Sequence, residues 1–126
     1  MRLLLDTHVL LWWLLESPKL PAVVLAAMRD VRNDVFVSAA THAEISIKRS
    51  LGKLESPWIA DELLEENGLE PLPFTSAHGR RMLDLPFHHR DPFDRMLIAQ
   101  AMEDDLIFAT VDPRNQAYDI RILPAA

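Results

Sequence analysis

Short apolar runs alternate along the chain with longer segments in which apolar residues recur at helical spacing. Proline, glycine and asparagine residues punctuate the pattern. Short runs rich in leucine, valine and aromatic residues are typical of strands that are buried on both faces of a sheet. The runs predict strands at Leu3–Leu5, Val35–Val37, Leu69–Leu72 and Leu106–Ala109, and an edge strand at Ile120–Leu123.

The longer segments predict helices. Pro21 suits the start of one helix, Gly52 the end of another, and Asp91-Pro92 opens the clearest helix of the chain. Strands that alternate with helices indicate an α/β fold with a mostly parallel central sheet of about four to five strands, flanked by helices. The predicted helices are His8–Leu15, Ala22–Val31, Ala39–Leu51, a helix from Ser56-Pro57 to Asn67-Gly68, one from Thr75 or Ser76 to Leu85, and one from Asp91-Pro92 to Met102.

The composition predicts a single domain over residues 1–126. Apolar residues make up 49% and charged residues 25%, which excludes disorder as the main character. There is no cysteine, so disulfides, a thiol nucleophile and a cysteine-based zinc site are excluded. The longest apolar run, Val9–Leu15, is far shorter than the roughly 20 residues that span a bilayer, and no cleavage site follows it. We therefore expect no membrane association and a cytoplasmic location.

The net charge of −6 argues against nucleic acid as a partner, unless the acidic residues cluster around a divalent metal. Asp6 ends the first predicted strand and Asp112 follows the fourth. Glu44 lies on the helix after the second strand, and Asp94 in the first turn of the Asp91-Pro92 helix. Because the carboxyl ends of parallel strands meet at one edge of the sheet, these four carboxylates are able to converge.

Each acid also has an ordinary structural role open to it. Asp6 is able to cap the following helix, and Glu44 to pair with Lys48 one turn along. Asp94 suits the positive end of its helix dipole, and Asp112 before Pro113 is a common turn start. Spacing alone leaves both interpretations open for all four residues.

Four segments of the chain together form a recognisable pattern. They are Leu3–Trp12 (LLLDTHVLLW), Val37–Leu54 (VSAATHAEISIKRSLGKL), Arg90–Ala101 (RDPFDRMLIAQA) and Thr110-x-Asp112 with Tyr118. In this order the segments resemble the PIN-domain ribonucleases, in particular the VapC-type toxins of type II toxin–antitoxin systems. The Asp91-Pro92 segment is the most specific of them. Two positions depart from the family pattern: His42-Ala43 precede Glu44 where an aromatic residue is frequent, and Asn115 stands where an aromatic residue often follows the last aspartate.

The resemblance implies a PIN-like three-layer sandwich and a metal-dependent endoribonuclease that cleaves structured RNA, such as a tRNA or ribosomal RNA loop. It also implies a homodimer and neutralisation by a VapB-like antitoxin. The implied catalytic and metal-binding residues are Asp6, Glu44, Asp94 and Asp112, which would hold Mg²⁺, with Mn²⁺ able to substitute. Hard cations of this kind prefer carboxylate and water oxygens.

Further residues are candidates for supporting roles. Thr7 and Thr110 are placed to donate hydrogen bonds to the carboxylates, or to satisfy backbone groups. His88 and His89 are expected to flank the site in a polar loop without taking part in the chemistry. Bases near the acids would contact RNA phosphates on either side of the cut. These bases are Arg95, Lys48, Arg90 and Arg114.

Two other interpretations compete with the nuclease. A catalytically silent PIN-like domain would act as a protein-binding module, although all four carboxylates are present. A phosphoryl-transfer or receiver-type domain would use Asp6 as nucleophile. However, His8 stands where a second aspartate would be needed, and three glycines do not make a phosphate-binding loop.

Overall fold

The computed structural model describes residues 1–124 and has a five-stranded sheet in the order β3-β2-β1-β4-β5. Every pair of neighbouring strands is parallel, so the predicted α/β fold is confirmed and the sheet is wholly parallel. The strands are β1 (Arg2–Leu5), β2 (Asp34–Ser38), β3 (Leu69–Leu72), β4 (Ile107–Ala109) and β5 (Ile122–Leu123).

Strand β1 lies at the centre of the sheet and is buried on both faces. Successive side chains of a strand point to opposite faces. Accordingly Leu3 and Leu5 pack in one hydrophobic cluster, whereas Leu4 packs in the other. Two apolar faces explain why the sequence of β1 is an uninterrupted leucine run rather than an alternating pattern.

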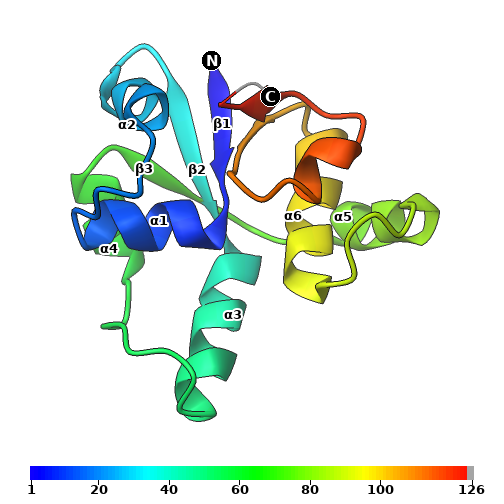
Figure 1. Ribbon diagram of the computed structural model, residues 1–126, viewed down its shortest axis with the longest axis horizontal. Coiled ribbons are helices and arrows are strands. Elements are labelled where there is room, and N and C mark those ends of the chain that lie inside the picture. Colours follow the sequence, from blue (N-terminus) through cyan, green and yellow to red (C-terminus); the bar gives the residue numbers. More distant parts are fainter. Residues whose placement is uncertain (125–126) are drawn as a thin grey trace.

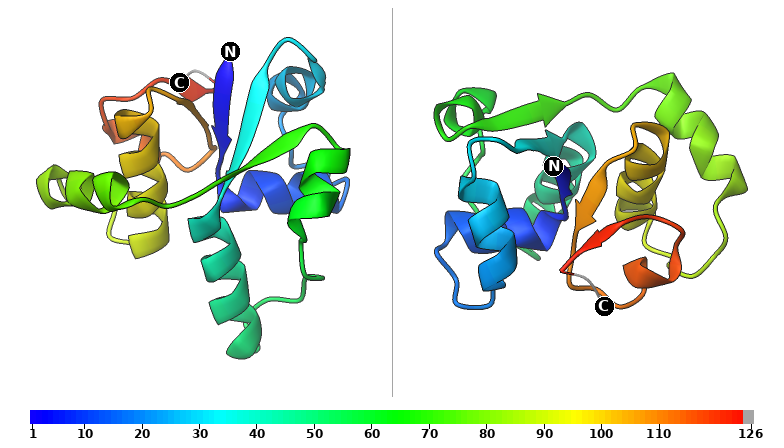
Figure 2. Two further views of the ribbon diagram at one scale, coloured as in Figure 1. Left: turned by 180° about the vertical axis from the view of Figure 1, so that it is seen from behind. Right: turned by 90° about the horizontal axis from the view of Figure 1, so that it is seen from above.

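Helices cover both faces and give the predicted three layers (Figures 1 and 2). On one face lie α1 (Thr7–Leu14), α2 (Ala22–Arg29) and α4 (Asp61–Glu66). On the other lie α5 (Ser76–Arg81) and α6 (Pro92–Glu103). Helix α3 (Ala39–Ser50) begins where β2 ends and extends beyond the sheet (Figure 1). Short 3₁₀ helices, η1 (Met82–Asp84) and η2 (Asn115–Ala117), complete the fold.

One predicted helix start is wrong. The helix expected from Ser56-Pro57 begins at Asp61, after Ala60 as its N-cap. The hydroxyl of Ser56 donates to the carbonyl of Pro57 instead of capping a helix. The preceding segment stays irregular because Ile59 is buried in the core and its carbonyl oxygen lies 2.8 Å from Nε2 of His42.

Other elements are shorter than predicted at their ends. Helix α2 stops at Arg29, and Val31 is almost fully exposed. Helix α5 ends at Arg81, and the chain continues as η1 toward Leu85. Within residues 1–124, no helix is long and apolar enough to cross a membrane.

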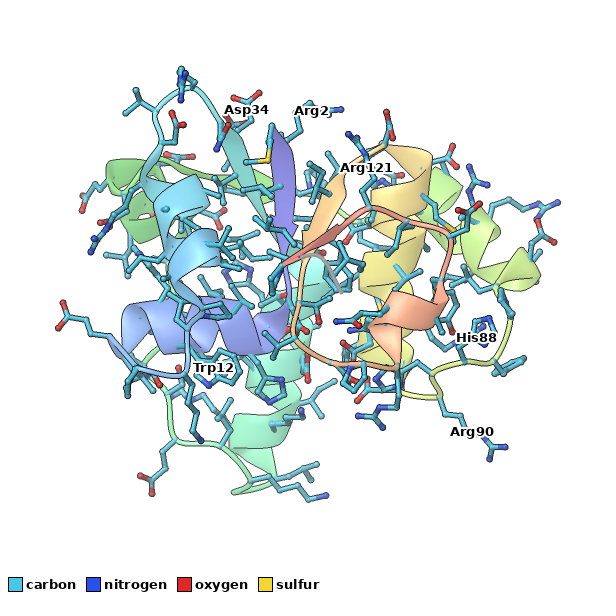
Figure 3. The ribbon with its side chains drawn as sticks, turned by 45° about the horizontal axis from the view of Figure 1, so that its top comes forward. Arg2, Trp12, Asp34, His88, Arg90 and Arg121 are labelled. Carbon is cyan, nitrogen blue, oxygen red and sulfur yellow. The ribbon has the colours of Figure 1, made fainter. Side chains whose placement is uncertain are left out.

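The carboxyl ends of three adjacent strands place polar residues side by side. Ser38 ends β2, Asp6 follows β1 and Thr110 follows β4. The backbone N–H of Asp6 donates to the carbonyl of Ala109, which ties the ends of β1 and β4 together. Arg2, Asp34 and Arg121 mark the opposite, amino-terminal edge of the sheet (Figure 3). The helices that connect the strands on one side of β1 cover one face of the sheet, and those on its other side cover the opposite face. Parallel α/β sheets bind ligands at the carboxyl ends of the strands at such a point.

Candidate metal centre

Asp6 is buried at the centre of the carboxyl edge. One carboxylate oxygen accepts from the backbone N–H of His8 at 3.2 Å, so Asp6 caps α1. The other accepts from the hydroxyl of Thr110 at 2.6 Å. Burial raises the pKa of Asp6. The hydrogen bond from Thr110 opposes this rise, and the nearby charge of Glu44 adds to it. The capping role and the candidate site role therefore fall on the same carboxylate.

Asp94, in the first turn of α6, lies close to Asp6. Asp91 is the N-cap of that helix and accepts from the backbone N–H groups of Phe93 and Asp94. Because Asp91 fills the capping position, the carboxylate of Asp94 is available to the candidate site. We call the four acids of this site the acidic cluster; they are Asp6, Glu44, Asp94 and Asp112. Burial raises the pKa of Asp94 to about 6, and the negative charges of Asp6 and Asp91 add to the shift. The charge of Asp6 is thus close enough to disfavour ionisation of Asp94.

Asp112 lies in a different environment, although it belongs to the same cluster. Arg114 donates to it from its backbone N–H and from its guanidinium. Burial by itself would raise the pKa of Asp112, but the hydrogen bonds from Arg114 outweigh burial and hold the pKa below its ordinary value. Asp112 is therefore more readily ionised than Asp6 or Asp94, and Arg114 already balances its charge.

Glu44 is buried on α3 and makes an ion pair with Lys48, with Nζ 2.6 Å from Oε2. The ion pair with Lys48 that the sequence allowed is therefore present, but the Glu44 carboxylate is buried rather than on a solvated helix face. The hydrogen bond to Glu44 raises the pKa of Lys48, and the charges of Asp91 and Asp94 add to this. Lys48 is therefore within electrostatic range of the cluster.

His89 joins two of the acids, which the sequence interpretation missed. Its ring is 3% exposed, and Nε2 lies 3.1 Å from Asp112 and 3.2 Å from Asp94. Nδ1 accepts the backbone N–H of Asp91 at 3.1 Å. The proton of the neutral ring must then sit on Nε2, from which it is donated to the carboxylates. The predicted polar loop beside the site thus buries His89 between two of the acids, whereas His88 is exposed.

The two threonines differ in their roles. The hydroxyl of Thr110 donates to Asp6 and accepts from the backbone N–H of Asp112 and from the side-chain amide of Asn115. The hydroxyl of Thr7 lies 3.0 Å from that of Thr41 on α3 instead of donating to a carboxylate. Thr110 thus belongs to the acidic cluster, and Thr7 links α1 to α3.

The PIN domain family model matches residues 3–121, which is nearly the whole chain. The chain belongs to the PIN domain family. The family predicted from the sequence segments is confirmed, as is the fold that the resemblance implied. No curated protein sequence matches this PIN domain.

Solved structures with the same fold include VapBC2 from Rickettsia felis bound to a DNA fragment from its promoter, with a TM-score of 0.65 and 13% identity over 97% of both chains. A toxin–antitoxin complex from Klebsiella pneumoniae has a TM-score of 0.61 at 16% identity, over 95% of this chain and 94% of that one. The PIN domain endonuclease Utp24 has a TM-score of 0.54 at 14% identity, over 96% and 82%. These likenesses support the fold of the PIN domain.

Arg95, predicted to contact RNA, is wrongly assigned, because in this PIN domain it is a buried structural residue. Its guanidinium donates to the carbonyls of Leu85, Pro86 and His89 and stacks over the ring of Phe87 at 4.1 Å. The hydroxyl of Tyr118 also donates to Pro86. Arg95 therefore holds the loop that carries His89, and the sequence could not show that its side chain points away from the solvent.

The other three predicted RNA-binding bases lie nearer to the surface. Lys48 pairs with Glu44 and Arg114 with Asp112, and the Arg114 side chain remains 64% exposed. Arg90 extends into solvent beside the His88 loop (Figure 3). Lys48 and Arg114 therefore contact acids of the candidate site, whereas Arg90 lies on the loop that leads into α6.

The donor set of the cluster fits a hard divalent cation. Ligand atoms of His89, Asp94 and Asp112 lie within 4.8 Å of one another. His89 is a poor ligand, however, because its Nε2 carries the proton and its Nδ1 accepts from the backbone. The carboxylates of Asp94 and Asp112 offer the oxygens that Mg²⁺ and Mn²⁺ prefer. Asp6 and Glu44 offer further carboxylates close by, outside this group of atoms. Burial raises the pKa values of Asp6 and Asp94, and a bound cation would favour their ionised forms.

Proposed function

We propose that this PIN domain is a metal-dependent endoribonuclease of the VapC toxin type. The observation that carries the proposal is a pair of carboxylates at the carboxyl edge of the sheet, buried Asp6 and half-buried Asp94, whose pKa values are both raised. A divalent cation between such groups would relieve their repulsion. PIN domains are typically metal-dependent nucleases, and one protein of the same fold is the endonuclease Utp24.

Each residue of the cluster has a distinct part in the proposed reaction. Asp6, Asp94 and Glu44 would hold Mg²⁺ or Mn²⁺, directly or through water. When bound, the metal supplies polarisation of the phosphate and a lowered pKa of bound water. Thr110 orients Asp6 through its hydroxyl, and His89 orients Asp94 and Asp112 through Nε2–H. Asp112 would hold water or a second metal at the rim.

The bases around the cluster counter the net charge of −6 where RNA would approach. Arg90 and Arg114 are exposed on the two loops that flank Asp94, and Lys48 lies on α3 across from them. Contacts from these side chains to phosphates would position the strand without reading its sequence. A folded RNA of the tRNA or ribosomal RNA class is the proposed substrate, and the cytoplasm the proposed location.

An antitoxin of the VapB type is the proposed protein partner, and the active unit is proposed to be a homodimer. Two of the proteins with the same fold are VapBC2 and a toxin–antitoxin complex. A basic side chain of a partner would be attracted to the ionised carboxylates of the cluster. Such a side chain would compete with the metal for Asp6 and Asp94, which gives inhibition a simple electrostatic basis.

The experiment is cleavage of total cellular RNA by the purified protein, with Mg²⁺, with Mn²⁺ and with EDTA. We expect discrete new fragments that disappear with EDTA and with Asp94→Asn. The matched control is Asp61→Asn, because Asp61 is an exposed acid that also lies in the first turn of a helix. Asp61→Asn should cleave like the parent. A folded parent that produces no fragments with either metal would favour a silent protein-binding domain instead.

A further inference from the structure

Asn115 is a fully buried polar residue that the sequence interpretation set aside as a departure from the family pattern. It opens η2, between β4 and β5, and its backbone N–H donates to the carbonyl of Asp112. The side-chain amide Nδ2 lies 3.1 Å from the hydroxyl oxygen of Thr110 and 3.4 Å from Oδ1 of Asp94. One amide group therefore contacts two members of the acidic cluster.

Asn115 is also linked to Asp6, through the hydroxyl of Thr110. The Thr110 hydroxyl accepts from the amide and donates a hydrogen bond to Oδ2 of Asp6 at 2.6 Å. The direction of this chain is fixed, because a hydroxyl has a single proton to donate and Asp6 receives it. Asn115 is thus connected to Asp94 directly and to Asp6 through one hydroxyl.

The other end of the same amide lacks a partner. Among the buried side-chain polar atoms of residues 1–124, Oδ1 of Asn115 is the one without a hydrogen bond. Turning the amide over would aim this oxygen at the carboxylate of Asp94 and would remove the donor from Thr110. The orientation is therefore dictated by the two acceptors of the cluster. An unsatisfied buried group of this kind calls for an explanation beyond packing.

We infer that Asn115 is a positioning residue of the metal centre, which fixes Asp94 directly and Asp6 through Thr110. The inference rests on the proposed metal-dependent function and adds a residue to it. Each carboxylate oxygen has two lone pairs, so an oxygen that accepts from Asn115 or Thr110 can still bind a cation. The amide thereby holds the two principal ligands in one arrangement before the metal arrives. Residues that orient metal ligands typically change metal affinity by about 10–100-fold when they are replaced.

Asn115→Leu separates this role from a merely structural one. Leucine has the same branched shape and number of side-chain heavy atoms, and it removes both the donor and the unpaired oxygen. We expect the melting temperature without metal to be unchanged or higher, and Mn²⁺ binding measured by calorimetry to weaken by about 10-fold or more. The kcat for RNA cleavage should fall while KM stays close to that of the parent. Asn115→Ala, which cannot overpack the site, should weaken Mn²⁺ binding in the same way.

Gln100→Leu is the matched control. Gln100 is also a fully buried amide, but it bonds to Ser38 and Pro73, away from the four acids. This variant should melt at a lower temperature and bind Mn²⁺ like the parent. If the parent binds Mn²⁺ and both Asn115 variants bind it equally well, the inference about Asn115 is overturned and the proposed function stands. If the folded parent binds no Mn²⁺, the proposed function and this inference are both overturned.

Discussion

Arg114 donates to both carboxylate oxygens of Asp112, from Nε to Oδ1 at 3.1 Å and from Nη2 to Oδ2 at 2.9 Å. Together with the backbone N–H of Arg114 and Nε2 of His89, four donors surround this carboxylate. Asp6 and Asp94 have fewer donors, and their pKa values are raised rather than lowered. The acids of the cluster are therefore unequal, with Asp6 and Asp94 needing a cation most and Asp112 already supplied with one.

Arg114→Gln should reveal this division. The substitution removes the positive charge that balances Asp112, so the melting temperature of the metal-free protein should fall slightly, as for other exposed ion pairs. Mn²⁺ should then raise the melting temperature by more than it does for the parent, because the cluster carries one more unbalanced charge. A thermal melt with and without Mn²⁺ measures both effects. An increase smaller than that of the parent would show that Arg114 does not compete with the cation.

Asp94 should make the metal-free protein less stable at neutral pH than at mildly acidic pH. In the folded state its pKa is raised from 3.8 to about 6, so the folded protein binds the proton more tightly than the unfolded chain. The free energy of unfolding therefore decreases as the pH rises through this window and stays lower above it. The melting temperature without metal should be higher near pH 5 than near pH 7. Asp94→Asn should reduce that difference, and an undiminished difference in this variant would contradict the assignment to Asp94.

His89→Leu tests the residue that joins two of the acids. The variant leaves the backbone N–H of Asp91 without its acceptor and removes the donor that Asp94 and Asp112 share. We expect a loss of about 1–3 kcal/mol in urea unfolding, the usual range for stranded buried polar groups, together with weaker Mn²⁺ binding. His88→Leu is the control, since His88 is exposed in the same loop. Equal stability of the two variants would mean that the ring of His89 does not hold the loop.

Arg95→Lys should destabilise the protein. A lysine cannot reproduce the planar set of donors with which Arg95 reaches Leu85, Pro86 and His89, so we expect a loss of about 1–3 kcal/mol in the free energy of unfolding, measured in urea.

Arg90→Gln should unfold like the parent and bind RNA more weakly. The salt dependence of RNA binding should weaken by the amount that corresponds to about one phosphate contact. The prediction fails if Arg90→Gln leaves the salt dependence of RNA binding unchanged.

Much of the fold could be predicted because local and global signals agree. The leucine run of β1 predicts a strand that is buried on both faces, and Asp91-Pro92 predicts the start of α6. Where the prediction was wrong, tertiary contacts decided the structure. The burial of Ile59 keeps the chain after Ser56-Pro57 out of a helix, and the pattern of the sequence contains no sign of that contact.

The acids of the candidate site were found from their places after strands and at helix starts, but their partners were not. The side-chain direction of Arg95, the burial of His89 and the contacts of Asn115 depend on how the 85–90 loop and η2 pack against α6. A signal for Asn115 was present in its departure from the aromatic residue of similar sequences. Its meaning required the distances to Thr110 and Asp94.

Calorimetric titration of Mn²⁺ into the parent, Asp6→Asn and Asp94→Asn shows whether these two carboxylates are principal ligands of a divalent cation. We expect saturable binding by the parent that is lost or weakened at least 10-fold in both variants, each of which remains folded without metal. Asp61→Asn should bind like the parent. If the Asp6 and Asp94 variants bind Mn²⁺ with the affinity of the parent, these two carboxylates are not its principal ligands.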